Sequence, residues 1–159
     1  MTIETFQTRM RRTGQRHDRC IICGRRNRRG LGLRFKACRD GSVEASFACP
    51  ESYEGYSGVL HGGVVSALLD SAMTNCLFAQ GLEAFTAELN VRFLKPVRTL
   101  HPALVRACLT RSCPPLFRLE ATLHQTGSLM ARATASFIRR TGSETTSFQR
   151  KEIDTDPRY

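Results

Sequence analysis

The stretch from His61 to Val97 holds the side chains best suited to chemistry. It reads HGGVVSALLDSAMTNCLFAQG and continues, after three residues, as FTAELNVRFLKPV. One carboxylate, Asp70, lies inside an otherwise apolar segment, and burying a carboxylate without a partner is costly. Such a group suits a general base that activates water, or a nucleophile that attacks a carbonyl carbon. The alternative is a structural Asp70 that a hydroxyl or a backbone amide satisfies.

The triplet His61-Gly62-Gly63 precedes the same apolar segment. If a helix begins here, its first amides have no acceptor within the helix and carry the positive end of the helix dipole. Glycine lets a substrate carbonyl approach these amides, so Gly62 or Gly63 could stabilise an oxyanion. The alternative is that the glycines only form the turn. His61 is expected to fix this entry loop.

The spacing of Gly62 and Asp70 constrains any joint mechanism. Eight residues of α-helix separate them by about 12 Å, whereas an oxyanion donor and a base must meet at one carbonyl group. The site must therefore combine Gly62 or Gly63 of one subunit with Asp70 of another. This predicts an obligate dimer with two equivalent sites related by a two-fold axis.

Hydrophobic periodicity predicts the elements that carry these residues. Apolar positions repeat every three and four residues over 62–79, which predicts a helix that ends near Gly81. Strict alternation over 85–95 predicts a strand with two distinct faces. One face would carry Phe85, Ala87, Leu89, Val91 and Phe93, and the other Thr86, Glu88, Asn90 and Arg92.

Other segments read as strands around this helix. Two alternating runs, 31–38 and 43–49, flank an Asp40-Gly41 pair that is typical of a hairpin turn. A loop is expected over 51–60, and three further strands are expected at 102–112, 116–125 and 128–140. Because one mostly apolar helix lies among six strands, the sheet must wrap around it for both to be buried.

Charge and composition divide the chain into a basic N-terminal arm (1–19), a single domain (20–140) and a polar C-terminal tail (141–159). The arm forms either a short helix or no fixed structure. Residues 1–40 carry nine of the ten net positive charges. Such an arm attracts nucleic acid, anionic lipid or a phosphorylated cofactor such as coenzyme A; the alternative is a solvated, partly disordered terminus. The longest apolar run contains Asp70, so a core helix is favoured over a transmembrane segment. No secretory signal is evident, and a cytoplasmic location is expected.

The seven cysteines have no disulfide-framework spacing, which favours reduced thiols. Five cysteines, most of them in apolar segments, are expected to act as small core residues: Cys38, Cys49, Cys76, Cys108 and Cys113. His17, Cys20 and Cys23 have ligand-like spacing, and Cys38 could complete a zinc site. A single CxxC is a weak signal, however, and no metal site is predicted.

Three coinciding features resemble the hotdog-fold acyl-CoA thioesterases, and most of all the phenylacetyl-CoA thioesterase group. They are the His-Gly-Gly triplet, an aspartate nine residues after the histidine, and the strand LNVRFLKP. The opening CIICGRRNRRGLGLRF is similar to the CxxCGxxNxxGLxLxF pattern of a subset of these proteins. The resemblance spans about 20–140. It implies an α+β hotdog fold, in which a curved antiparallel sheet of about six strands wraps around one long central helix, assembled as a dimer or tetramer.

The resemblance also implies an activity, hydrolysis of an acyl-CoA thioester without a cofactor. It assigns Asp70 as base or nucleophile and Thr86 as the residue that orients the attacking water; the alternative is that Thr86, a common strand residue, simply faces solvent. The His61 imidazole, besides fixing the entry loop, could hydrogen-bond near the thioester sulfur. Arg92 and Lys95, on the edge of the motif strand, are candidates for contacts to coenzyme A phosphates. Many relatives have an asparagine where this chain has Gly55. In relatives the side chain of that asparagine polarises the thioester carbonyl. Here the backbone amide at the helix start would polarise it alone, or one of the next two residues, Tyr56 and Ser57, would substitute for the asparagine.

Because that asparagine is missing, a non-catalytic acyl-CoA-binding or regulatory module is the alternative function. A nucleic-acid-binding protein would use the basic arm, but the chain lacks a recognition-helix signature and an aromatic stacking platform. No nucleic-acid partner is therefore expected. A hotdog dehydratase is less favoured, since no second catalytic histidine has the required motif around it.

Overall fold

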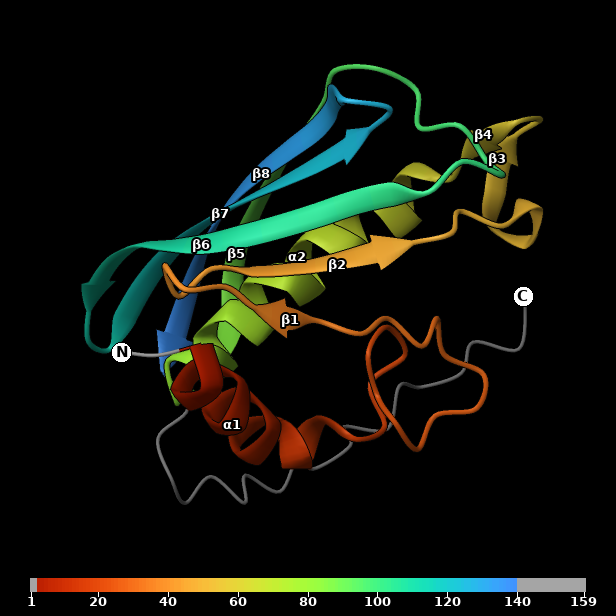
Figure 1. The fold of residues 1–159 in the computed structure, drawn as a ribbon. Helices are drawn as coiled ribbons and strands as arrows, with labels where there is room; N and C mark the ends of the chain where they lie inside the picture. The colour runs from red at the N-terminus through yellow and green to blue at the C-terminus, as the bar shows by residue number, and fades with distance from the viewer. Residues whose placement is uncertain (1–2, 140–159) are drawn as a thin grey trace, which may run out of the picture.

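The computed structural model describes residues 3–139, in which a curved antiparallel sheet wraps around one long helix (Figure 1). This arrangement confirms the α+β fold expected from the sequence, while the proposed tail at 141–159 lies outside the described residues. The six strands pair in the order β1-β2-β6-β7-β8-β5. Their bounds are Lys36–Ala37 (β1), Val43–Phe47 (β2), Ala84–Phe93 (β5), Ala103–Cys113 (β6), Leu116–Gln125 (β7) and Ser128–Arg139 (β8).

The central helix α2, Gly62–Ala79, has the bounds that its apolar periodicity predicts. Gly81, with a φ of 78°, follows its end. The side chains of Leu68, Met73 and Leu77 are fully buried within the core. The length and composition of α2 would also suit a membrane span. Since the sheet covers its apolar side chains, core packing accounts for that composition.

Strand β5 departs from the predicted alternation near its start. A β-bulge shifts its register with β8 between Thr86 and Glu88. As a result Phe85 lies opposite the exposed Ile138, whereas Thr86 lies opposite Phe137, which is fully buried. Directly opposed residues share a face of the sheet, so Thr86 points inward, toward α2. The prediction that Phe85 shares a face with Leu89 and Thr86 shares the face of Glu88 is wrong, because an even two-residue period does not continue through a bulge.

The N-terminal segment is folded onto the domain. Helix α1, Ile3–Thr13, packs on the C-terminal half of α2 and leads into a 3-10 turn, Gly14–His17 (Figure 1). Phe6 and Met10, one helical turn apart, are 8% and 6% exposed. The alternative of a solvated terminus is therefore wrong for this helix and turn, because an apolar stripe at i and i+4 has a core surface to bury against.

Two segments differ from the predicted strand pattern. The backbone of Leu31 and Leu33 donates hydrogen bonds to Ile21 and Ile22, at 2.7 and 2.9 Å. Only the end of the predicted strand 31–38 therefore pairs with β2, as β1. The predicted loop at 51–60 holds a 3-10 turn and a small hairpin, with bounds Glu51–Tyr53 (η2), Glu54–Tyr56 (β3) and Val59–Leu60 (β4).

All seven cysteines are free thiols in this structure. Cys49 and Cys76 are buried, as expected for small core residues, but Cys108 and Cys113 are exposed. The expectation was wrong for this second pair. Strand β6 turns its odd-numbered positions inward near its start, so that Ala107 is buried and Cys108 faces outward.

Replacing Phe6 with alanine tests whether α1 belongs to the cooperative fold. We expect this variant to lose about 3 kcal/mol of unfolding free energy, because a largely buried aromatic ring is removed. The measurement is equilibrium denaturation by urea. Ile21→Ala is the control, since Ile21 is 66% exposed and should change stability by less than about 0.5 kcal/mol. Equal stability of the two variants would show that α1 folds and unfolds independently.

Candidate active site

His61 organises the start of α2. Its Nδ1 accepts a hydrogen bond from the Gly63 N–H at 2.9 Å, and so caps the helix. The His61 N–H donates to the carbonyl of Tyr53 at 2.8 Å, and its own carbonyl accepts from Val64 at 2.9 Å. His61 therefore lies where a structural role requires it. Its cap also occupies the Gly63 amide, which leaves Gly62 as the candidate oxyanion donor.

The Gly62 amide borders an open cleft of about 420 Å³. No described residue accepts a hydrogen bond from this N–H. A Cβ placed on Gly62 would lie 3.6 Å from the ring of Phe93, so the end of β5 forms one wall. Tyr56, 84% exposed, and Lys95 also line the cleft. Its other lining residues are mostly apolar: Gly55, Val59, Leu60, His61, Val65, Leu94, Pro96 and Val97.

Asp70 forms a second arrangement, eight residues further along α2. The hydroxyl of Thr86 donates to Asp70 Oδ1 at 2.8 Å, an interaction that the bulge in β5 makes possible by turning Thr86 inward. Burial raises the pKa of Asp70 above its ordinary value, and the Thr86 hydrogen bond partly opposes that effect. The nearby Cys20 raises this pKa further and His17 lowers it. Asp70 is thus a half-buried carboxyl group with one hydroxyl partner.

These two arrangements do not meet within one chain. Neither Asp70 nor Thr86 lines the cleft at Gly62, and eight helical residues rise by about 12 Å. Lys95 lines the cleft as a phosphate contact would require. Arg92 lies opposite Arg132 of β8 and does not line the cleft.

Both arrangements lie along the same edge of the sheet. Strand β5 pairs with β8 on one side, and no described strand pairs with its other side. Thr86, which bonds Asp70, is near the start of β5, and Phe93, which lies beside Gly62, is at its end. Phe93 and the neighbouring Leu94 are 54% and 42% exposed. This edge therefore carries exposed apolar residues, and its two ends lie beside the two candidate catalytic groups on α2.

Phe93 is a site residue that the sequence analysis did not identify. The alternation only placed it on the apolar face of its strand, whereas the structure shows it half-exposed, as the wall beside Gly62. The available signal was its position as the last apolar residue before Leu94 and the charged Lys95. At such a strand end the core no longer covers the inward face.

Comparisons with known proteins find relatives of this chain. The family model described as the thioesterase superfamily matches residues 57–112, which include both Gly62 and Asp70. Acyl-coenzyme A thioesterase THEM4 of Rattus norvegicus is 30% identical over 88 residues, which are 54% of this chain and 38% of the relative. The chain thus matches less than half the length of that relative.

Two solved structures share the fold. A phenylacetic acid degradation-related protein of Ralstonia eutropha is 28% identical with a TM-score of 0.62, covering 68% of this chain and 85% of that one. A Streptococcus mutans protein bound to acetyl CoA is 17% identical with a TM-score of 0.64, covering 68% of this chain and 88% of that one. Together with the matched segment, these findings show that the chain has the hotdog fold and is similar to the thioesterase superfamily over 57–112 and to the phenylacetyl-CoA thioesterase-like group.

Proposed function

We propose that this protein hydrolyses an acyl-CoA thioester to a free acid and coenzyme A. The observation that carries the proposal is the hydrogen bond from Thr86 to Asp70, a carboxyl group whose pKa burial raises. A carboxylate with a raised pKa is a stronger base, and its pKa lies nearer to neutral pH, which favours proton transfer from water. The acyl-coenzyme A thioesterase named above, and the acetyl-CoA held by a protein of the same fold, support the substrate class.

In the proposed reaction, the Gly62 N–H binds the thioester carbonyl oxygen. Asp70 takes a proton from a water molecule that Thr86 helps to orient, and the resulting hydroxide attacks the carbonyl carbon. The negative charge then lies on the carbonyl oxygen, where the amide and the helix dipole stabilise it. Collapse of this intermediate breaks the carbon–sulfur bond, and the proton held by Asp70 passes to the departing thiolate. Trapping of an acyl-aspartate in a single turnover would instead establish direct attack by Asp70.

The proposed site needs two copies of the chain. If two β5 strands pair in antiparallel fashion about a two-fold axis near Leu89 and Asn90, Thr86 of one strand lies beside Phe93 of the other. That pairing would bring the Asp70 side of one protomer to the Gly62 side of its partner. An unpaired edge ten residues long with exposed apolar side chains is a natural surface for such pairing.

The cleft beside Gly62 suits the chain of an acyl-CoA. Its apolar lining, which includes Phe93 and Val97, would cover the acyl or pantetheine portion, and Lys95 would contact a phosphate group. Tyr56 and Gly55 lie on the same cleft. A side chain on Gly55 would come within 3.2 Å of His61 Cδ2, so this position accommodates the histidine cap rather than a polarising asparagine.

The direct test is release of free thiol in steady state from short-chain, long-chain and aromatic acyl-CoAs. We expect turnover of at least one of these substrates by the wild type. Asp70→Asn serves as the control for thiol release that does not depend on the proposed catalytic base. If both proteins bind acyl-CoA and are equally inert, the chain is a non-catalytic acyl-CoA-binding module.

The pH dependence of hydrolysis follows from the surroundings of Asp70. We expect kcat/KM to fall as the pH drops through the raised pKa of Asp70, since the protonated carboxyl group cannot accept a proton. Thr86→Val removes the hydrogen bond that lowers this pKa. It should move the acid limb of the profile to higher pH and reduce kcat/KM at neutral pH roughly tenfold. Thr86→Ser, which keeps the hydroxyl, should resemble the wild type. If the acid limb did not move in Thr86→Val, ionisation of Asp70 would not be its cause.

A further inference from the structure

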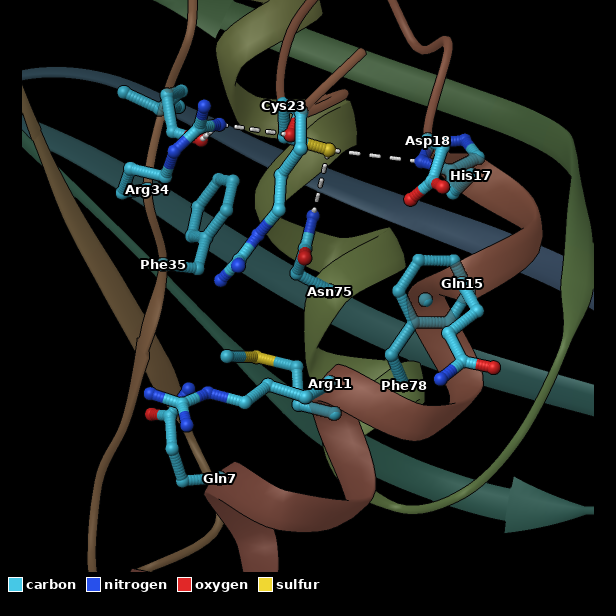
Figure 2. Close-up of a pocket in the computed structure, with 14 residues that line it drawn as sticks. Gln7, Arg11, Gln15, His17, Asp18, Cys23, Arg34, Phe35, Asn75 and Phe78 are labelled. Carbon is cyan, nitrogen blue, oxygen red and sulfur yellow. Dashed lines mark hydrogen bonds between the residues drawn. The ribbon is translucent and has the colours of Figure 1, made fainter.

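A second cluster of reactive side chains lies where the N-terminal segment meets α2. The sequence HDRCIIC places His17, Cys20 and Cys23 in one compact turn. One donor atom from each, a ring nitrogen or a sulfur, lies within 4.8 Å of the other two. His17 Nδ1 and Cys23 Sγ are 3.6 Å apart, and Figure 2 shows them facing each other. Imidazole and thiolate groups at this spacing form a donor set for a soft divalent metal ion.

The groups around the two sulfur atoms are hydrogen-bond donors. The Ile22 N–H donates to Cys20 Sγ at 3.3 Å. Asn75, on α2 and 8% exposed, donates its amide to Cys23 Sγ at 3.4 Å (Figure 2). Donors of this kind stabilise metal-bound thiolates and fix the orientation of the ligands.

Ser71, on α2 and 3% exposed, adds its hydroxyl group to these donors, because its side chain interacts with Cys23. Polar donors from Ser71 and Asn75 therefore line the α2 side of Cys23.

The backbone holds the cluster in place. Gly24 follows Cys23 in a turn so tight that a Cβ would come within 2.5 Å of the Asp18 carbonyl oxygen. The Gly24 N–H donates to the carbonyl of Cys20 at 3.0 Å, and the Cys20 N–H donates to that of His17 at 3.0 Å. The three side chains therefore project from a closed loop, and their mutual placement depends little on the rest of the chain.

A cavity of about 290 Å³ borders the cluster. Its walls include His17, Cys23 and Asn75, with Phe35 and Phe78 as apolar surface (Figure 2). Three protein donors leave one position of a tetrahedral metal ion for another ligand. The cavity gives water or a small anion access to that position.

We propose that His17, Cys20 and Cys23 bind one Zn²⁺ ion, with water or a small ligand as the fourth donor. Two thiolates balance the charge of the dication, so the bound site adds no net charge beside α2. Cys38 is not a member, because it lies in the β1–β2 turn, where its N–H donates to Ser42. The site fastens the N-terminal segment to α2.

The test uses the full chain, reduced, stripped with a chelator and titrated with Co²⁺ as the probe. We expect one Co²⁺ per chain, with a sulfur-to-cobalt charge-transfer band and the visible bands of a tetrahedral ion. Zn²⁺ should displace the Co²⁺ and bleach both sets of bands. Zn²⁺ should also raise the Tm of the stripped protein, whereas Mg²⁺ should not, because binding to the folded state alone stabilises it.

Variants assign the ligands. Cys20→Ser and Cys23→Ser should each lose tight Co²⁺ binding, whereas Cys20→His should keep the metal with a weaker sulfur band. Cys113→Ser removes an exposed thiol outside the cluster and should behave as the wild type. The proposal is overturned if the wild type shows no sulfur-to-cobalt band, or if the band persists in both serine variants. It is also overturned if Cys20 and Cys23 form a disulfide when Zn²⁺ is present.

Discussion

Asp70→Asn is expected to lower kcat for acyl-CoA hydrolysis by roughly 10²- to 10⁴-fold, the usual contribution of a general base. Asparagine has nearly the same shape, and its carbonyl can still accept the 2.8 Å hydrogen bond from Thr86. It cannot take a proton from water at neutral pH. Substrate binding, measured by calorimetry with a slowly hydrolysed acyl-CoA, should change little, since asparagine keeps the size and the hydrogen bond of the aspartate.

The stability of the same variant separates catalysis from structure. Burial raises the pKa of Asp70 in the folded state, so the folded state binds more protons than the unfolded state between the two pKa values. Stability therefore falls as the pH rises through that window and stays lower above it. Asp70→Asn should be at least as stable as the wild type at neutral pH, with the difference vanishing below the ordinary pKa of aspartate.

Asp40 provides a matched control, because its pKa is shifted in the opposite direction from that of Asp70. Hydrogen bonds from Ser42 hold the pKa of Asp40 below its usual value, with a smaller contribution from Arg106. Asp40→Asn should therefore destabilise the protein at neutral pH and leave turnover unchanged. If Asp70→Asn behaved like this control, with full activity and lower stability, Asp70 would be a structural residue.

The central helix and most strands were predictable because their patterns are local. The apolar repeat over 62–79 and the alternation over 116–125 give the bounds of α2 and β7 without correction. For residues 1–19 the sequence left a short helix and the absence of fixed structure both open, because charges dominate that segment, although Phe6 and Met10 have helical spacing. The burial of α1 depends on a tertiary surface that no local pattern describes.

The candidate site was predictable in its residues but not in its details. Sequence spacing placed Gly62 and Asp70 on one helix, and the distance between them followed from helix geometry. It could not reveal that His61 caps Gly63, since either glycine amide could have been the one occupied. Nor could it reveal the bulge that brings Thr86 to Asp70, because the strand keeps its alternation of residue types through that point.

Gly62→Pro is the second substitution for which we expect a large effect. Proline at this position removes the N–H that would bind the oxyanion, and the loss of one such donor typically lowers kcat by about 10²- to 10³-fold. The backbone should accept the change, because proline is favoured at the first position of a helix. His61, the preceding residue, already has the extended φ and ψ of −59° and 133° that proline requires.

Gly62→Ala is the matched control for this substitution. It keeps the N–H, and its Cβ would make an ordinary contact, 3.6 Å from the ring of Phe93. We expect alanine to retain most of the activity that proline loses, with kcat as the measurement. If alanine lost as much as proline, crowding of the cleft rather than loss of the amide would explain the effect.

Mixing the two inactive variants tests whether each site spans two chains. If Gly62 of one protomer acts with Asp70 of its partner, a mixed dimer of Asp70→Asn and Gly62→Pro holds one intact site and one doubly damaged site. Random reassociation of equal amounts should then recover about a quarter of wild-type activity. If both residues acted within one chain, every site in the mixture would carry a lesion and no activity would return. Recovery would therefore require that the carboxylate and the amide at one thioester come from different copies of the helix.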